Sequence, residues 1–270
     1  MNYIITLTIA GSDCSGGAGI QADIRTLSAL GCYAASAITA VTVQDTRGVE
    51  SVHAVAPAVV AAQVKAVMDD LHPQAAKVGM AVDGPMVKAI AEALDGAHFP
   101  IVVDPVMVAT SGDRLLQVDA LEAMRHSLVP RATLLTPNLP EAEALAGMTI
   151  ADNADADEAA RRILAMGCQA LLIKGGHRAG AYKTDRLYVP GHDVVVYTGQ
   201  TVDTRNTHGT GCTLSAAITA YLARGLRLEE AVGAARHYLQ QALEAGAEIV
   251  VGHGHGPVNH LFNPERLIIK

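Results

Sequence analysis

Short apolar runs alternate with stretches of helical periodicity along most of this chain. Residues 3–10 form a β-branched apolar run, a glycine-rich loop follows, and apolar residues within 20–30 recur on one helical face. Parallel strands need a long connection, usually a helix, so this alternation predicts a mostly parallel sheet with helices on both faces. Further strands are expected at residues 34–43, 49–55, 75–79, 101–103, 134–135 and 170–173, and helices at 57–71, 85–94, 118–128, 139–145 and 156–166.

Residues 182–202 interrupt this alternation, because they combine β-forming residues with turn signals and have no helical period. We expect hairpin-like strands there. A second long helix is expected at 228–248, followed by a glycine and histidine loop at 252–260. No repeat, low-complexity tract or linker divides the chain, so residues 1–270 are predicted to form a single α/β domain.

The composition argues against several classes of function. With no Trp, two Phe and a net charge of −7, the chain lacks the basic and aromatic surface that nucleic acids require. No uncharged apolar run approaches the roughly 18 residues of a membrane-spanning helix. The four cysteines have no Cys-x-x-Cys spacing and no secretory leader is recognisable, so a reduced, cytoplasmic protein is expected. A small anionic ligand would therefore need a local site.

The strongest local signal is the stretch 203–217, where a loop with two glycines leads into a helix expected at 213–221. The amides of Gly209, Thr210, Gly211 and Cys212 then lie at a helix N-terminus, where the backbone dipoles favour an anion. The same position is expected to lower the pKa of the Cys212 thiol below about 8.5, so that it could accept a proton or attack. The alternative is a helix cap with a buried structural cysteine.

Polar side chains follow three of the predicted strands, and ligands of parallel sheets bind at these carboxyl ends. Asp104, which leads towards Ser111 and Gly112, could hold Mg²⁺ directly or through water. Asn138 and Glu141 lie one helical turn apart and face the same way, and Lys174 could reach a nucleotide phosphate. The alternatives are a cap or turn aspartate, an ordinary helix start at Glu141, and an ordinary Gly-Gly turn after Lys174.

The glycine loop at 15–19 matches neither the dinucleotide-binding pattern nor the P-loop, which argues against dehydrogenases and P-loop kinases. It could close over a small substrate, with Asp23 and Gln44 as polar contacts. The Gln44 amide suits a ring with adjacent donor and acceptor atoms, and Met80 could face a flat ring. The alternatives are a solvated helix aspartate, a turn glutamine and a methionine that fills a core gap.

The histidines carry no firm assignment. His253, His255 and His260 lie in a glycine loop without the spacing or the cysteines of a zinc site, so no metal is assigned to them. His177 and His208 are also unassigned, because loop histidines commonly bond to the backbone.

Taken together, these motifs resemble the hydroxymethylpyrimidine/phosphomethylpyrimidine kinases of thiamine biosynthesis, within the ribokinase-like superfamily. The resemblance implies a three-layer α/β/α fold. It also implies two ATP-dependent phosphorylations, first of 4-amino-5-hydroxymethyl-2-methylpyrimidine and then of its monophosphate. The motifs cover nearly the whole chain in order: residues 10–13, 15–23, 104–107, 136–143, 174–177 and 208–213.

The resemblance also implies roles for individual residues. Cys212 is similar to the base that deprotonates the substrate hydroxyl, and the amides of Gly209, Thr210 and Gly211 to the anion hole for the transferring phosphate. Mg²⁺ is expected at Asp104 and Glu141, and ATP at Lys174, Thr207 and Asn138. The pyrimidine pocket is expected to be lined by Gly11, Asp23, Gln44, Met80 and Val106. A homodimer is also implied.

Some positions depart from the family pattern. Cys14 and Asp45 stand where proline and asparagine are expected, and both lie in the substrate loops, so they affect fine specificity more than reaction type. Cys212 replaces the aspartate of most ribokinase-like sugar kinases, which points to the vitamin-kinase branch. A pyridoxal/pyridoxine kinase is the alternative enzyme, since some share the Gly-Thr-Gly-Cys loop. A non-catalytic pyrimidine-binding module is the alternative outside the enzymes.

Overall fold

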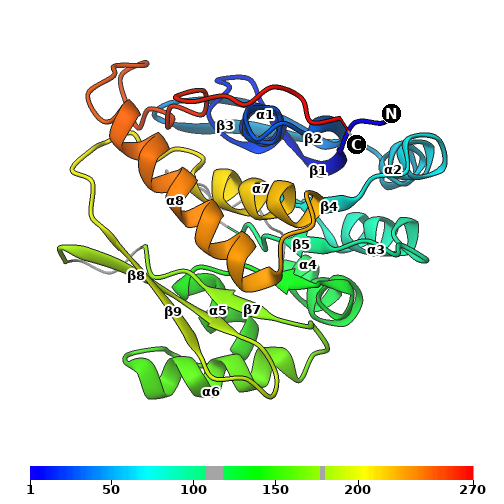
Figure 1. The fold of residues 1–270 in the computed structure, drawn as a ribbon. Coiled ribbons are helices and arrows are strands. Elements are labelled where there is room, and N and C mark those ends of the chain that lie inside the picture. Colours follow the sequence, from blue (N-terminus) through cyan, green and yellow to red (C-terminus); the bar gives the residue numbers. More distant parts are fainter. Residues whose placement is uncertain (108–117, 177–179, 270) are drawn as a thin grey trace.

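The computed structural model describes residues 1–107, 118–176 and 180–269. Within them, one sheet has the strand order β3-β2-β1-β4-β5-β6-β7-β8-β9 (Figure 1). The strands are β1 (Ile5–Asp13), β2 (Tyr33–Asp45), β3 (Gly48–Ala54), β4 (Ala75–Val78), β5 (Ile101–Val103), β6 (Leu134–Leu135), β7 (Leu171–Ile173), β8 (Tyr182–Tyr188) and β9 (Val195–Gln200).

The sheet is parallel through its centre and antiparallel at both edges. Strands β2, β1, β4, β5, β6 and β7 run parallel to one another. At the edges, β3 pairs antiparallel with β2, and β8 pairs antiparallel with β7 and β9. The mostly parallel sheet predicted from the alternation is confirmed, and the loops after the parallel strands meet at one edge.

Helices cover both faces of the sheet and give three layers. On one face, α1, α7 and α8 form a core with sheet residues such as Val102 and Leu172, and Figure 1 shows α7 and α8 packed together on this side. On the other face, α2 to α6 pack against residues such as Ile9 and Val103. The helices are α1 (Gly19–Ala29), α2 (Pro57–Leu71), α3 (Gly84–Ala93), α4 (Val118–Ala123), α5 (Leu139–Ala146), α6 (Asn153–Leu164), α7 (Thr210–Ala223) and α8 (Leu228–Gly246).

Strand β4 shows how the two faces are assigned. Side chains alternate along a strand, so Ala76 and Val78 belong to the core beneath α2 and α3, whereas Ala75 belongs to the core beneath α1 and α7. Lys77 therefore projects from a fully buried strand into the layer of α1 and α7. A charge at that position needs a partner.

Most predicted elements differ by a few residues in their boundaries, and three of the differences concern the site or a break in a helix. The helix expected at 118–128 ends as α4 and continues as a π-turn, η1 (Met124–Leu128), and a 3₁₀ turn, η2 (Val129–Arg131). Pro130 has no backbone N–H to donate, so a regular α-helix ends before it. Strand β2 extends to Asp45, and α7 begins at Thr210 rather than at residue 213.

The hairpin expected at residues 182–202 is confirmed as β8 and β9, which form the edge of the sheet beyond β7. The N-terminal and C-terminal segments lie together (Figure 1), because Tyr3 pairs with Ile269 in an isolated antiparallel bridge. No described helix has the length and apolar character needed to span a membrane.

Candidate active site

The loop that leads into α7 lies at the carboxyl edge of the sheet, as the sequence predicts. Gly209 is the N-cap of α7 and has a left-handed backbone, with φ 79°. The Thr210 amide donates a hydrogen bond to the Thr207 carbonyl oxygen at 3.3 Å, and this bond closes a turn just before the helix. The first turn of α7 thus directs its amides towards the sheet edge, where an anion is favoured.

Glycines are required where three loops pass one another at this edge. A Cβ on Gly209 would lie 2.0 Å from the Gly17 carbonyl oxygen, and a Cβ on Gly19 would lie 2.2 Å from that of Gly11. Both residues also have positive φ. The glycine loop at 15–19 therefore lies directly against the loop before α7, which only residues without side chains permit.

Asp104 and Lys174 form an ion pair beside the first turn of α7. Lys174 Nζ donates to Asp104 Oδ1 at 2.7 Å, and Asp104 is 2% exposed. Ser215 on α7 reaches the other oxygen, Oδ2, at 3.3 Å. A Cβ on Gly211 would lie 3.5 Å from both Asp104 Oδ2 and Lys174 Nζ, so the pair touches the predicted anion loop directly.

The charge of Lys174 is held by this environment. Although burial opposes the ammonium, the carboxylates of Asp104 and Glu141 raise the pKa of Lys174 above its ordinary value. An ammonium and a carboxylate thus both lie beside Gly211 of the anion loop. The sequence predicts this gathering of Asp104, Lys174 and Gly211, although it leaves their contacts open.

Asn138 and Glu141 make a capping box at the start of α5. The Asn138 side chain accepts from the Glu141 amide at 2.9 Å, and Glu141 Oε2 accepts from the Asn138 amide at 2.7 Å. The capping role that the sequence left as an alternative is therefore present. Burial raises the pKa of Glu141 to about 7. The charge of Lys174 opposes this shift, whereas the charge of Asp104 adds to it. Glu141 therefore interacts electrostatically with the Asp104–Lys174 pair.

Cys212 lies in the first turn of α7 and is partly exposed to solvent. Burial raises the pKa of Cys212 to about 11, although the charge of Lys77 acts in the opposite direction. The prediction that the helix start lowers this pKa is wrong. Although Cys212 is partly exposed, the desolvation of its thiolate outweighs the effect of the nearby Lys77 ammonium.

Asp23 lies beneath the site rather than in an open pocket. Its side chain is fully buried, and it accepts from Lys77 Nζ at 2.8 and 2.9 Å and from Thr8 Oγ1 at 2.6 Å. The structure thus departs from the expectation that Asp23 lines the substrate pocket, because both oxygens are occupied within the protein. Sequence reasoning did not identify Lys77, although a lysine inside the apolar run 75–79 was a signal for a buried pair.

This buried pair is charged. Burial raises the pKa of Asp23 and so works against its ionisation, yet Asp23 only accepts hydrogen bonds, which is the pattern of a carboxylate. Burial likewise opposes the ammonium of Lys77, but Asp23 holds the pKa of Lys77 above its usual range. Since Cys212 and Asp104 contribute to that shift, Lys77 lies close enough to act on the thiol.

Gly11 and Met80 lie together on the β1 and β4 side of the site. The register of β1 against β2 shifts between Ala10 and Ser12, a bulge at Gly11. A Cβ on Gly11 would lie 3.0 Å from the Met80 sulfur. Val106 follows Asp104 and donates back to its carbonyl at 2.8 Å. Three residues predicted for the pyrimidine pocket are thus positioned by the ends of β1, β4 and β5.

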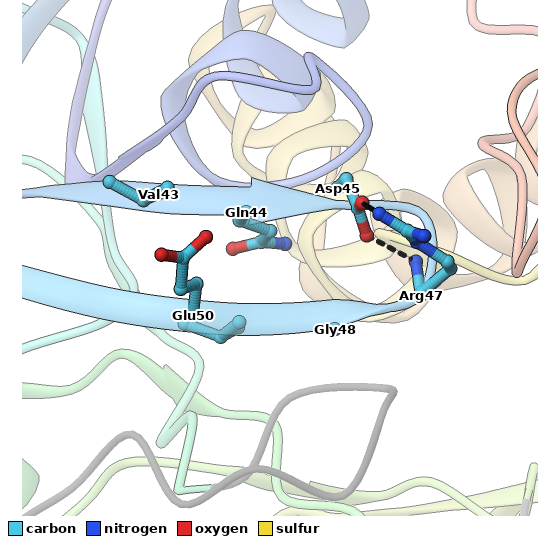
Figure 2. A pocket seen from close by; sticks show the side chains of 7 residues that line it. Val43, Gln44, Asp45, Arg47, Gly48 and Glu50 are labelled. Carbon is cyan, nitrogen blue, oxygen red and sulfur yellow. Dashed lines mark hydrogen bonds and ion pairs between the residues drawn. The ribbon is translucent and has the colours of Figure 1, made fainter.

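Gln44 lies near the end of β2 and lines an open hollow of about 500 Å³ in the β2–β3 hairpin. Figure 2 shows its amide between the two strands, with Glu50 on the facing strand and the Asp45–Arg47 ion pair at the tip. On its other side the Gln44 amide approaches His208, with 3.1 Å between the two Nε2 atoms. The hollow and the loop before α7 therefore meet at Gln44.

The three histidines of the loop at 252–260 have structural partners. His260 Nε2 lies 3.1 Å from Thr213 Oγ1, and His253 and His255 lie in a loop whose amides bond to Thr46. Among the described residues, no group of three or more His, Cys, Asp or Glu side chains is arranged for a metal ion. Ser111, Gly112 and His177 lie outside the described residues.

The site thus combines an anion-binding helix start, a cation beside it, two carboxylates at the same edge and a polar amide on the facing hairpin. This arrangement suits the transfer of a phosphate between two bound molecules.

The three-layer fold of this chain is shared with solved structures of ribokinase-like kinases. A pyridoxal kinase from Staphylococcus aureus in complex with pyridoxal superposes with a TM-score of 0.87 at 34% identity, over 97% of this chain and 94% of that one. A phosphomethylpyrimidine kinase from Clostridium difficile gives a TM-score of 0.79 at 41% identity, over 89% and 99%.

The sequence comparisons define the family more narrowly. The family model described as phosphomethylpyrimidine kinase matches residues 13–259. A hydroxymethylpyrimidine/phosphomethylpyrimidine kinase from Rhizobium meliloti is 50% identical over 95% of this chain and 96% of its own length. The protein of the same description from Escherichia coli is 45% identical over 96% and 98%. The chain belongs to the phosphomethylpyrimidine kinase family and is a phosphotransferase.

Proposed function

We propose that this enzyme uses ATP to phosphorylate the hydroxymethyl group of 4-amino-5-hydroxymethyl-2-methylpyrimidine, and then phosphorylates the monophosphate to the diphosphate. The observation that carries this proposal is the contact of the Asp104–Lys174 pair with Gly211, 3.5 Å from its Cβ position. An ammonium this close to the loop supports the binding of a phosphate there, and the Asp104 carboxylate lies equally near. A phosphoryl group held there faces the acceptor side formed by Gly11, Met80 and Gln44.

In the proposed reaction, the acceptor oxygen attacks the γ-phosphorus, the new O–P bond forms, and the bond to the β-phosphate oxygen breaks to release ADP. The hydroxyl proton passes to the thiolate form of Cys212, which becomes a thiol. The amides of Gly209 to Cys212 and the Lys174 ammonium stabilise the charge on the transferring group. Thr207 and Asn138 support the nucleotide side of the same loops.

Asp104 and Glu141 fit a magnesium site, although Lys174 already bonds to one Asp104 oxygen. The two carboxylates act on each other electrostatically at one sheet edge. Mg²⁺ is usually held by one or two carboxylates together with substrate phosphates and water. When bound, the ion neutralises charge on the β- and γ-phosphates. Asp104 and Glu141 would hold it there, directly or through water.

A substrate comparison tests the function. The purified enzyme, ATP and MgCl₂ are combined with either the hydroxymethylpyrimidine or pyridoxine, ADP release is followed, and products are identified by mass spectrometry. We expect the pyrimidine diphosphate to form, with a larger kcat/KM for the pyrimidine. Preferential turnover of pyridoxine would assign the enzyme to the pyridoxine branch, and tight pyrimidine binding without ADP release would indicate a non-catalytic module.

Pyridoxal or pyridoxine kinase activity is the second candidate. It is supported by the TM-score of 0.87 to the S. aureus pyridoxal kinase with bound pyridoxal. This activity ranks second because the chain is 50% identical to the R. meliloti pyrimidine kinase but 34% identical to the S. aureus pyridoxal kinase.

Replacing Lys174 with methionine is expected to raise the KM for ATP and lower kcat, by about 100-fold in kcat/KM for ATP. Removing one preorganised donor at a developing charge typically costs about 2.7–4 kcal/mol. Initial rates at varied ATP measure the change. Lys65→Met serves as the control, because Lys65 is an exposed lysine on helix α2. Equal losses in both variants would contradict a specific role for Lys174.

We also propose a homodimer, supported by the family resemblance, and a cytoplasmic location, supported by use of ATP and by cysteines that are all free thiols. Light scattering during size-exclusion chromatography measures the oligomeric state. Cell fractionation measures the location.

A further inference from the structure

Asp13, His208 and Gln44 form a chain of contacts that joins three loops. His208 Nε2 lies 2.8 Å from Asp13 Oδ2 and 3.1 Å from Gln44 Nε2. Asp13 ends β1, His208 precedes the anion loop and Gln44 ends β2. Asp13 and His208 are only 3% and 7% exposed, so water contributes little to their contacts.

The partners of Asp13 fix the proton on His208. Its oxygens accept from the amides of Ser15, Gly17 and Ala18 at 2.8, 3.1 and 2.8 Å, and from the Ser15 hydroxyl at 2.7 Å. Although burial opposes the charge, these bonds and His208 lower the pKa of Asp13 to about 2, so Asp13 is a carboxylate. The His208 nitrogen that faces it, Nε2, must therefore carry the hydrogen.

A protonated Nε2 can only donate, and this constrains Gln44. In the orientation of the structure, the Gln44 Nε2 faces His208 and its oxygen accepts from Thr42 Oγ1 at 3.2 Å. The contact with His208 is then between two donors. A half-turn of the amide places its NH₂ on Thr42 Oγ1 and its oxygen on His208, where the oxygen shares the single Nε2 hydrogen with Asp13 in a three-centre bond. Thr42 already donates to the Ser12 carbonyl at 3.0 Å, so every group in this second arrangement has a partner.

We propose that His208, held by Asp13, is a positioning residue that selects the acceptor ring by fixing the orientation of the Gln44 amide. The inference rests on the proposed function and deepens it. With its oxygen on His208 and one N–H on Thr42, the amide turns its remaining acceptor and donor together towards the acceptor side. A ring that carries an amino group next to a ring nitrogen satisfies both at once.

The same arrangement discriminates against a hydroxypyridine. When pyridoxine is aligned by the hydroxymethyl group that is phosphorylated, its second hydroxymethyl group takes the place of the amino group and its ring hydroxyl takes the place of the ring nitrogen. These groups project further from the ring, so the ring cannot approach the amide closely enough to make both hydrogen bonds. A site built to hydrogen-bond a substrate loses affinity for an analogue that leaves one of its polar groups unpaired. Fixing the amide therefore favours the aminopyrimidine, whereas a freely turning amide discriminates less.

A purely structural role is the competing explanation for His208. The glycine loop packs on its ring, because a Cβ on Gly17 would lie 2.3 Å from His208 Cδ2. Loss of that packing would disturb both loops and would lower turnover of every acceptor. The two roles are therefore separated by the ratio of kcat/KM for the hydroxymethylpyrimidine to that for pyridoxine.

The test compares His208→Met with His208→Gln. The two replacements are similar in length and volume, but only glutamine carries an N–H group that can lie between Asp13 and Gln44. We expect His208→Met to lower the selectivity ratio about tenfold, equivalent to about 1.4 kcal/mol, through a higher KM for the pyrimidine. His208→Gln is expected to restore the ratio to within roughly threefold, since about one hydrogen bond is at stake.

Controls separate the outcomes. The KM for ATP and the melting temperature report on the anion loop and the fold. His126→Ala, which changes an exposed histidine of η1, is expected to leave the ratio unchanged. If His208→Met fails to fold, Thr42→Val removes the partner at the other end of the amide and is expected to lower the ratio in the same direction. Equal losses for both acceptors, or a ratio unchanged in His208→Met and Thr42→Val, would overturn the inference. A wild-type enzyme that does not phosphorylate the pyrimidine would instead overturn the proposed function.

Discussion

Replacing Cys212 with alanine is expected to lower kcat by about 100- to 10,000-fold, the usual contribution of a general base. The KM for both substrates is expected to change much less, because the amides of the anion loop belong to the backbone and remain in place. Steady-state rates with the hydroxymethylpyrimidine at saturating ATP measure the loss. Cys168→Ala is the matched control, since Cys168 is a buried thiol that bonds to the Ile163 carbonyl in the core.

The pH dependence of this reaction follows from the raised pKa of Cys212, about 11. Below that value the thiolate fraction grows about tenfold per pH unit. The kcat/KM for the acceptor is therefore expected to rise from pH 7 towards pH 10 in the wild-type enzyme, and Cys212→Ala is expected to lose this rise. The same slope in both enzymes, or turnover by the alanine variant close to that of the wild type, would argue that another group takes the proton.

Replacing Lys77 with methionine is expected to destabilise the protein by about 3–5 kcal/mol, because it leaves the carboxylate of Asp23 buried without its counter-charge. Both residues of this pair have no solvent-exposed side-chain surface. Equilibrium unfolding in urea, followed by circular dichroism, gives the change in the free energy of unfolding. A loss below about 1 kcal/mol would mean that the pair is not charged in the folded protein.

The double variant Lys77→Met with Asp23→Asn separates charge from packing. Neutralising both partners removes the unpaired carboxylate, so we expect the double variant to recover part of the stability lost in Lys77→Met. In Lys77→Met, loss of the ammonium is expected to raise the pKa of Cys212 further and so to lower kcat/KM at pH 8. The Asp23 carboxylate acts on the pKa of Cys212 in the opposite direction to the ammonium, so its removal in the double variant is expected to offset part of this loss. An unchanged kcat/KM in Lys77→Met would argue against an electrostatic role for Lys77.

Local patterns were sufficient for the anion loop. The two glycines and the helix pattern after residue 208 predict a helix start, and α7 begins at Thr210 with Gly209 as its cap. The carboxyl ends of parallel strands necessarily share an edge, so the sequence also predicts that Asp104 and Lys174 approach the loop. Their 2.7 Å contact is the consequence.

Local patterns were insufficient where burial sets the chemistry. A helix start alone implies a low pKa for Cys212, but the glycine loop and the layer beneath it remove water from the thiol and raise that pKa. Asp23 falls on the helix after the glycine loop, which made it a candidate for the pocket. The Asp23 side chain instead points to Lys77, which lies 54 positions away in the chain.

The alternation of strands and helices thus determined the layered sheet, the edge at which its loops meet and the types of residue found there, because these follow from backbone periodicity and parallel connections. Only the tertiary structure decided which charges are paired beneath Cys212, which nitrogen of His208 carries a hydrogen and which group turns the Gln44 amide. Those properties depend on desolvation and on contacts between residues distant in the chain, such as Asp13 and His208, 195 positions apart.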